Sequence, residues 1–359
     1  MGSARRIAAP VLGAVIEECF VALGLASSDS AAVAEVLVDA NLRGIDSHGF
    51  QRVPIYMRRV GAGLAGGTTD MKVVADAGCM CRMDAANALG PAAAVKAVGR
   101  AVALGQQHGV GLVTLRRGSH FGAAGFYARK VACSGMVGMV MTNAVARMAP
   151  FGATEAFFGT NPLAIGVPLP GREPLVLDMS SSVAAQGRIT RARDLGTAIP
   201  EGWAVDADGR PTTDPARALA GSLLSVGGPK GSGLAMAISA LAVLLAGADC
   251  DDQMGSMYRD FDRPQNVGQV FLAIDHGRLA DPTDGDRLSE MVGRLEMLPP
   301  VSGSTPVRYP GQDGAVLAAR RRRDGIPIED ADVRQVVAVC VELGLETVAR
   351  RVATALEVP

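Results

Sequence analysis

A histidine and an arginine stand four residues apart near the N-terminus, in residues 47–52 (SHGFQR). On a helix, residues at this spacing share one face about a turn apart. Arg52 can hold a carboxylate through two parallel hydrogen bonds, and His48, whose ordinary pKa is near neutral, can exchange a proton with the adjoining part of the same molecule. The pair therefore predicts a site for a small carboxylate substrate. The alternative is a surface histidine beside a charged helix.

Three glycine-containing turns could hold a phosphate or a substrate: residues 118–125 (GSHFGAAG), 227–233 (GGPKGSG) and 158–162 (FGTNP). The first two precede predicted helices, at about Ala123 and from Leu234, whose free N–H groups favour an anion, and Lys230 adds a positive charge. Thr160 and Asn161 offer neutral donors and acceptors. Each segment could equally be an ordinary turn. No strand is followed by G-x-G-x-x-G, so the standard dinucleotide fingerprint is absent.

Length and composition limit the classes of protein. With 359 residues, 48% of them hydrophobic, and a net charge of −1, two domains are expected, and neither nucleic acid nor a membrane surface is an expected partner. The arginine run at 320–323 is interpreted as the solvated part of a helix. The apolar segment 234–248 is too short to span a bilayer and predicts a buried core helix. The six scattered cysteines are typical of a reduced, cytoplasmic protein, and no histidine grouping indicates a metal site.

The elements that must position these residues alternate between helices and strands. Helical periodicity covers residues 11–42, where residues 27–30 (SSDS) are expected to separate two helices and cap the second, and a third helix is expected from about 50 to 60. Glycines at 61–67 indicate a domain boundary, and the polar segment 187–221 predicts surface loops. Further predicted elements are strands at 71–74, 111–115, 136–142, 163–167, 175–178 and 270–275, a helix at 91–108, and a helical region after Pro306. This alternation predicts a layered α/β domain.

Six motifs in order make the chain resemble the type-2 malate/L-lactate dehydrogenase family, which includes sulfolactate, ureidoglycolate and diketogulonate dehydrogenases and cyclic imino-acid reductases. The resemblance covers most of the chain. Its motifs are residues 42–49 (LRGIDSHG), 119–125 (SHFGAAG), 158–164 (FGTNPLA), 178–180 (DMS), 230–231 (KG) and 310–311 (PG).

The resemblance implies a fold, a division into domains and a set of roles. The fold is an α/β, three-layer, non-Rossmann cofactor domain with a mixed, largely antiparallel sheet (69–302), beside a helical domain formed by both termini (1–68 with 303–359). The family is usually dimeric, which implies a homodimer. His48 would be the proton donor, with Ser47 in its hydrogen-bond relay, and Arg52 and Thr160 would bind the substrate. The residues implied to hold NAD or NADP are His120, Phe121, Gly122, Ala123, Ala124, Asp178, Met179, Ser180, Pro229, Lys230, Arg308, Pro310 and Gly311.

Departures from the family pattern bear on the substrate. Imino-acid reductases of the family carry His-Gly-Asp where this chain has Gln186-Gly187-Arg188, which favours a 2-hydroxy acid over a cyclic imine such as piperideine- or pyrroline-2-carboxylate. Arg188 could bind a second anionic group or be a solvated loop residue. Arg308 could pair with a 2′-phosphate, which slightly favours NADPH. Many members have an aromatic residue where Ser232 stands. A family member that binds a nucleotide without catalysis is the rival from another class of function.

Overall fold

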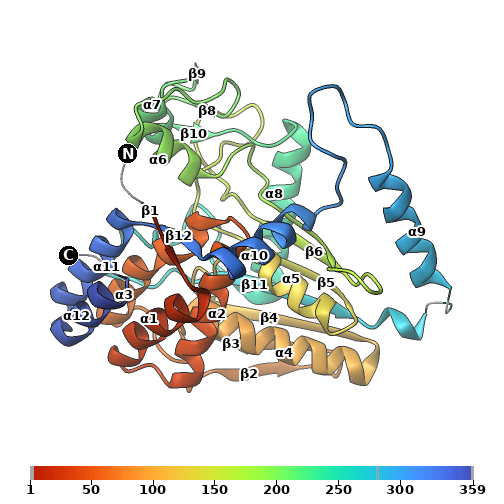
Figure 1. Cartoon of the computed structure of the whole chain (residues 1–359), viewed down its shortest axis with the longest axis horizontal. Coiled ribbons are helices and arrows are strands. Elements are labelled where there is room, and N and C mark those ends of the chain that lie inside the picture. Colours follow the sequence, from red (N-terminus) through yellow and green to blue (C-terminus); the bar gives the residue numbers. More distant parts are fainter. Residues whose placement is uncertain (1–3, 280, 282, 357–359) are drawn as a thin grey trace.

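A seven-stranded sheet forms the middle of the protein in the computed structural model, which describes residues 4–279, 281 and 283–356 (Figure 1). Only β3 and β4 pair in parallel; every other neighbouring pair in this sheet is antiparallel. The predicted mixed, largely antiparallel sheet is therefore confirmed. In spatial order the strands are β2 (Lys72–Asp76), β3 (Met80–Asp84), β4 (Val110–Gly118), β11 (Val267–Ile274), β5 (Val137–Thr142), β6 (Leu163–Val167) and β7 (Leu175–Met179).

Helices cover both faces of this sheet. The first face packs against α4 (Gly90–His108) and α5 (Ala124–Cys133), and the second against α8 (Pro229–Leu241) and the π-helical turn Ala242–Ala246. The buried side of α4 consists largely of alanine, so the helix lies close to β4: a Cβ added at Gly111 would lie 2.0 Å from the Ala101 carbonyl oxygen. Small residues thus set the spacing between this helix and the sheet.

Segments from both ends of the chain lie side by side (red and blue in Figure 1). Strands β1 (Ala4–Ile7) and β12 (Ile326–Glu329) pair antiparallel. The helices, which share one apolar core, are α1 (Ala9–Ala22), α2 (Ser27–Leu42), α3 (Val53–Gly61), α10 (Gln312–Asp324), α11 (Asp330–Glu342) and α12 (Glu346–Ala355). Residues 1–3 and 357–359 of the expected helical domain lie outside the described residues. Helix α9 (Asp284–Glu296) lies at the edge of the molecule, where its Val292 packs against Leu169 and Tyr309 (Figure 1).

The prediction of surface loops for residues 187–221 is wrong. This segment forms a small folded unit with α6 (Gln186–Asp194), α7 (Pro215–Ala220) and a three-stranded sheet in the order β10 (Ser222–Leu223), β8 (Ala204–Val205), β9 (Pro211–Thr212). Its core contains Ile189, Ile199 and Leu223. The apolar residues are too widely spaced for a periodic pattern, so only their convergence in space reveals the unit.

Two predictions about helices are also wrong. Residues 27–30 do not cap α2: they form its first turn, the N-cap is Ala26, and the buried Asp29 carboxylate accepts hydrogen bonds from the Thr68 backbone and hydroxyl at 2.7 and 2.6 Å. The apolar helix is mostly exposed rather than buried. Helical residues 229–246 are long and apolar enough to cross a membrane, but only 28% of them are buried: Ile238 packs on the sheet and Ala235 on the cluster that contains Met148, while Leu244 is exposed.

Candidate active site

His48 and Arg52 are not on one helix. Asp46–His48 and Phe50–Arg52 form two separate 3-10 turns, and the backbone between them bends at Gly49. This bend requires glycine, because an added Cβ would lie 2.2 Å from Oδ1 of Asn41. The same Oδ1 accepts a hydrogen bond from the Phe50 backbone at 2.7 Å. The helical geometry expected for the pair is wrong, but the folded turn still brings the imidazole within the electrostatic influence of the guanidinium.

The His48 ring lies between a hydroxyl and a second imidazole. Ser47 Oγ is 3.0 Å from His48 Nδ1, and the His48 and His120 rings stack with centroids 5.6 Å apart. Burial, followed by the charge of Arg52, lowers the pKa of His48 to about 3. Burial, followed by the charges of Arg52 and His48, lowers the pKa of His120 as well. Both rings are therefore neutral at neutral pH while no anion neutralises Arg52.

Arg52 is a buried cation that forms no ion pair within the described residues. Its Nε has no hydrogen-bond partner there, and its Cζ lies 5.8 Å from the centroid of the Tyr258 ring. Burial lowers the pKa of the guanidinium. An unsatisfied buried donor is costly, and a carboxylate would satisfy it. The arrangement is suited to an anionic substrate next to His48.

Tyr56 is a site residue that the sequence reasoning missed. Its hydroxyl is 2.6 Å from His120 Nδ1, and burial raises its pKa, so it remains protonated. It follows Arg52 by four residues, in α3, and this spacing could have identified it. The Tyr56 contact fixes the orientation of His120 beside His48.

The 120–125 turn meets the end of β7. The Gly125 backbone donates to Asp178 Oδ2 at 2.9 Å, and Gly122 adopts a positive φ of 87°. Asp178 is solvent-exposed, yet the surrounding protein raises its pKa by desolvation. The side chains of Phe121, Ala123 and Ala124 are buried, and Phe121 stacks on Tyr127 in the core, so these three residues present mainly backbone to this region.

Two further predicted segments lie against β7. The Val176 backbone donates to the Pro310 carbonyl at 2.9 Å, and Gly311, with φ 91°, lies so close to β7 that an added Cβ would be 3.0 Å from the Val176 nitrogen. Met179 ends the strand, and the Ser180 hydroxyl bonds the Ser182 carbonyl at 3.2 Å.

Thr160 reaches the same region through backbone contacts. Its carbonyl accepts from the Ser181 backbone at 2.8 Å. The next residue, Asn161, is fully buried with φ 20° and donates to Asp251 Oδ2 at 2.7 Å. Asp251 also accepts from the Gly159 backbone and the Ser239 hydroxyl, so this buried carboxylate holds the turn. No local pattern in the sequence indicates Asp251, which lies some 90 residues away.

The glycine pair before α8 lies in the last of the predicted cofactor segments. Gly227 and Gly228 both have φ 61°, and the helix begins at Pro229 rather than at Leu234. Lys230 is exposed and forms no ion pair within the described residues. The Val226 backbone donates to the Ser181 carbonyl at 2.9 Å, which connects this turn to the 178–182 segment.

Two arginines that are predicted site residues, Arg308 and Arg188, lie at the protein surface. Arg308 is exposed and its Nε lies 2.9 Å from Asp313 Oδ1, so an acid already accompanies it. Arg188 is exposed in the first turn of α6 and no described contact connects it to Arg52 or His48. Its neighbour Gly187 does lie beside the site, since an added Cβ would be 3.5 Å from the Ser47 Cβ.

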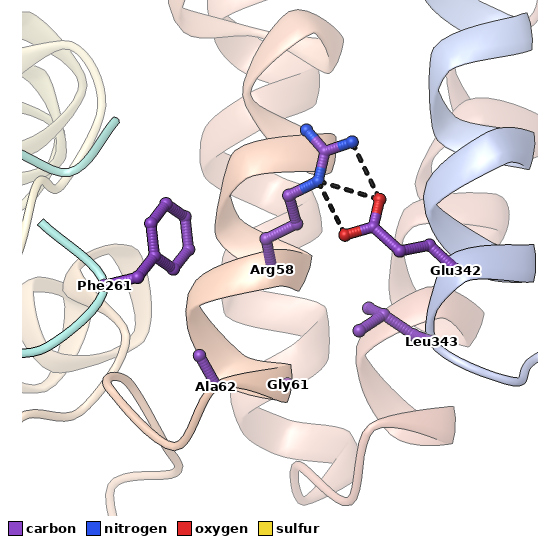
Figure 2. Close-up of a pocket in the computed structure, with 6 residues that line it drawn as sticks. All are labelled: Arg58, Gly61, Ala62, Phe261, Glu342 and Leu343. Atoms are coloured by element: carbon purple, nitrogen blue, oxygen red, sulfur yellow. Dashed lines mark hydrogen bonds and ion pairs between the residues drawn. The ribbon is translucent and has the colours of Figure 1, made fainter. Parts of the chain in front are cut away.

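The opposite side of α3 faces α11. Figure 2 shows Arg58 directed at Glu342 of α11, with hydrogen bonds of 2.9 to 3.2 Å, and Phe261 on the other side of the helix. These residues line a surface pocket of about 400 Å³ that contains none of the predicted site residues. This face lies away from Tyr56, which contacts His120, and from Arg52, which precedes the first turn of the helix.

The two neutral histidines predict an acid-sensitive fold. The unfolded chain binds a proton at each histidine below pH 6.5, whereas folded His48 does so only near pH 3, so stability falls as the pH falls through this window. Between pH 6.5 and 5, His48 is expected to contribute about 1 to 2 kcal/mol to this loss. Urea unfolding of wild type and His48→Gln at pH 7.5 and 5 would measure it. Equal losses in both proteins would contradict a buried neutral His48.

Comparisons with known proteins identify the family. Residues 7–337 match the family model described as malate/L-lactate dehydrogenase. The chain is 36% identical over 326 residues to a ureidoglycolate dehydrogenase (NAD(+)) of Escherichia coli O157:H7, which covers 90% of this chain and 93% of that one. It is 37% identical over 267 residues to a (2R)-3-sulfolactate dehydrogenase (NADP(+)) of Chromohalobacter salexigens, covering 72% and 78%.

A solved structure agrees with the sequence comparisons. The Δ1-piperideine-2-carboxylate reductase of Pseudomonas syringae pv. tomato superposes with a TM-score of 0.84 at 30% identity, over 93% of this chain and 99% of that one. The chain belongs to the malate/L-lactate dehydrogenase family. It is an oxidoreductase of the dehydrogenase type, as the resemblance predicted.

Proposed function

We propose that the protein interconverts a small 2-oxo acid and the corresponding 2-hydroxy acid, of the malate, lactate or sulfolactate type, with NAD(P)H and with His48 as the proton donor. The observation that carries the proposal is the buried Arg52 Nε, which has no partner in the part of the chain that the structure describes, next to a neutral imidazole. A 2-oxo acid supplies a carboxylate for the guanidinium and places its carbonyl on the next carbon, where a proton must be added.

The chain's own residues account for the proton transfer. Arg52 binds the substrate carboxylate, which neutralises the charge that opposes protonation of His48. His48 then takes a proton from solvent and donates it to the carbonyl oxygen, while Ser47 Oγ orients Nδ1. The bound nicotinamide supplies the hydride for the substrate carbon. In the oxidative direction His48, already neutral, accepts the hydroxyl proton.

The residues around β7 fit a dinucleotide. The exposed Lys230 beside Gly227 and Gly228 suits its phosphates, and the exposed Asp178, which accepts from the Gly125 backbone at the start of α5, suits a polar group of the cofactor. We propose that His120 to Ala124, Asp178 to Ser180, Pro229, Lys230, Arg308, Pro310 and Gly311 hold it, and that Thr160 contacts substrate. The mostly antiparallel sheet supports a non-Rossmann cofactor domain at 69–302 beside a helical domain of 1–68 with 303–359.

A substrate panel tests the proposal. Purified protein would be mixed with NADPH or NADH and with pyruvate, oxaloacetate, sulfopyruvate or piperideine- and pyrroline-2-carboxylate, and the loss of nicotinamide absorbance recorded. Turnover of an oxo acid is the expected result. Turnover of the imines alone would favour the second candidate, a cyclic imino-acid reductase, which the likeness to the piperideine-carboxylate reductase supports. Cofactor binding without any turnover would indicate a non-catalytic family member.

Arg308 tests the preference between the two cofactors. If it contacts a 2′-phosphate, Arg308→Ala should raise the KM for NADPH about tenfold, since a charged hydrogen bond is worth about 1.5 kcal/mol, and leave the KM for NADH within twofold. Asp313→Asn removes the acid that now pairs with Arg308 and should lower the KM for NADPH. Equal effects on both cofactors would argue against NADPH.

The remaining expectations are a homodimer and a cytoplasmic location. Light scattering coupled to size-exclusion chromatography would give the mass in solution, and a single-chain mass would exclude the dimer.

A further inference from the structure

Arg321 belongs to the arginine run at 320–323, whose predicted solvation is wrong for this residue. Only 12% of its side chain is exposed. Its two terminal nitrogens bind Asp46 Oδ1 and Oδ2 at 2.7 and 3.2 Å, and one of them also donates to the Asn41 carbonyl. Arg320 and Arg322, on either side of it in α10, are exposed. One arginine of the run is therefore largely buried and bound to other residues of the protein.

The partners of Arg321 enclose the turn that carries His48. Asp46 is the first residue of the 3-10 turn Asp46–His48. Asn41 donates to Asp46 Oδ1 at 2.7 Å and accepts from the Phe50 backbone at 2.7 Å, so its amide bridges the two ends of residues 46–50. Arg321 binds both Asn41 and Asp46. The three side chains thus hold Ser47 and His48 between fixed points.

The other end of α10 lies at the predicted cofactor region. The helix starts directly after Gly311, and Pro310 accepts the hydrogen bond from Val176, two residues before Asp178 in β7. Along its length α10 packs on the end of α2: an added Cβ at Gly44 would lie 2.6 Å from Leu317. One helix therefore contacts β7 at its start and the His48 turn near its end.

We infer that Arg321 is a positioning residue, which fixes the turn bearing Ser47 and His48 relative to α10 and hence to the cofactor region around β7. The inference rests on the proposed role of His48. A planar guanidinium bound to two carboxylate oxygens and a carbonyl fixes the orientation of these groups as well as their distance from α10. Displacement of a proton donor by about 1 Å can cost about 100-fold in rate. Arg321 itself needs no contact with the substrate.

The test compares Arg321→Gln with Arg322→Gln, a matched exposed arginine on the same helix. Arg321→Gln is expected to lower kcat about 10- to 100-fold while the NAD(P)H dissociation constant, from nicotinamide fluorescence, stays within twofold. Arg321→Lys keeps the positive charge but lacks the planar guanidinium that binds both carboxylate oxygens. It should therefore be more active than Arg321→Gln. The apparent pKa of the kcat profile should rise in Arg321→Gln, because a loosened turn admits water to His48. Arg322→Gln should match wild type.

The outcomes separate the inference from the proposed function. If His48→Gln is inactive but Arg321→Gln equals wild type in kcat and pH profile, the inference is wrong and the function stands. If His48→Gln is active, the proposed function is wrong. Should Arg321→Gln fail to fold, Asp46→Asn, which retains an oxygen for Asn41, must show the same fall in kcat and the same pH shift; wild-type values there would overturn the inference.

Discussion

Replacing His48 with glutamine is expected to lower kcat for oxo-acid reduction by about 10² to 10⁴, the usual contribution of a general acid. Glutamine retains much of the volume and a hydrogen-bonding group for Ser47 Oγ, but it cannot donate a proton from a titrating nitrogen. The KM for the acid should change little, because Arg52 still binds the carboxylate. Steady-state kinetics on the best substrate of the panel, with circular dichroism to confirm folding, would measure the effect.

The second imidazole provides the comparison for this result. The His120 ring centroid lies 5.6 Å from that of His48, and burial lowers the pKa of His120 too, but its Nδ1 is hydrogen-bonded to the Tyr56 hydroxyl. His120→Gln should raise the KM for cofactor more than it lowers kcat if His120 belongs to the cofactor loop. A folded His48→Gln that turns over within a few fold of wild type, together with an inactive His120→Gln, would transfer the proton-donor role to His120.

Replacing Arg52 with methionine is expected to lower kcat/KM for the acid about 10²- to 10³-fold. Loss of one partner from a buried charge pair costs about 2 to 5 kcal/mol, and each 1.4 kcal/mol is a factor of ten. The loss should fall mainly on the KM for the acid, and the KM for NAD(P)H should stay within twofold. Because the Nε of the buried guanidinium has no partner among the described residues, the variant should also melt at a temperature equal to or above that of wild type.

A matched variant on the neighbouring helix controls for general effects of arginine loss. Arg58 lies on the outer side of α3 and forms an exposed ion pair with Glu342, as Figure 2 shows. Exposed pairs contribute about 0 to 1 kcal/mol, so Arg58→Met should leave kcat/KM unchanged and the melting temperature nearly so. An Arg52→Met variant with an unchanged KM for the acid would show that the carboxylate binds elsewhere.

The sequence alone determined the elements whose signals are local. Six predicted strands and the helix ending at His108 form, because alternation, helical periodicity and a glycine in the left-handed region after His108 act over a few neighbouring residues. The motif residues were identified in the same way. The family followed from their order along the chain.

The tertiary structure decided what depends on contacts between distant segments. The insertion of β11 between β4 and β5, and the burial of Asp251 beneath the Thr160 turn, join residues about 90 or more positions apart, for which no local pattern exists. The role of Arg321 was likewise hidden, because an arginine in a basic run has the same sequence signature whether it faces water or a carboxylate. Chemistry-bearing residues could be named from the sequence, but the charges and hydrogen bonds that set their protonation arise only where the chain folds back on itself.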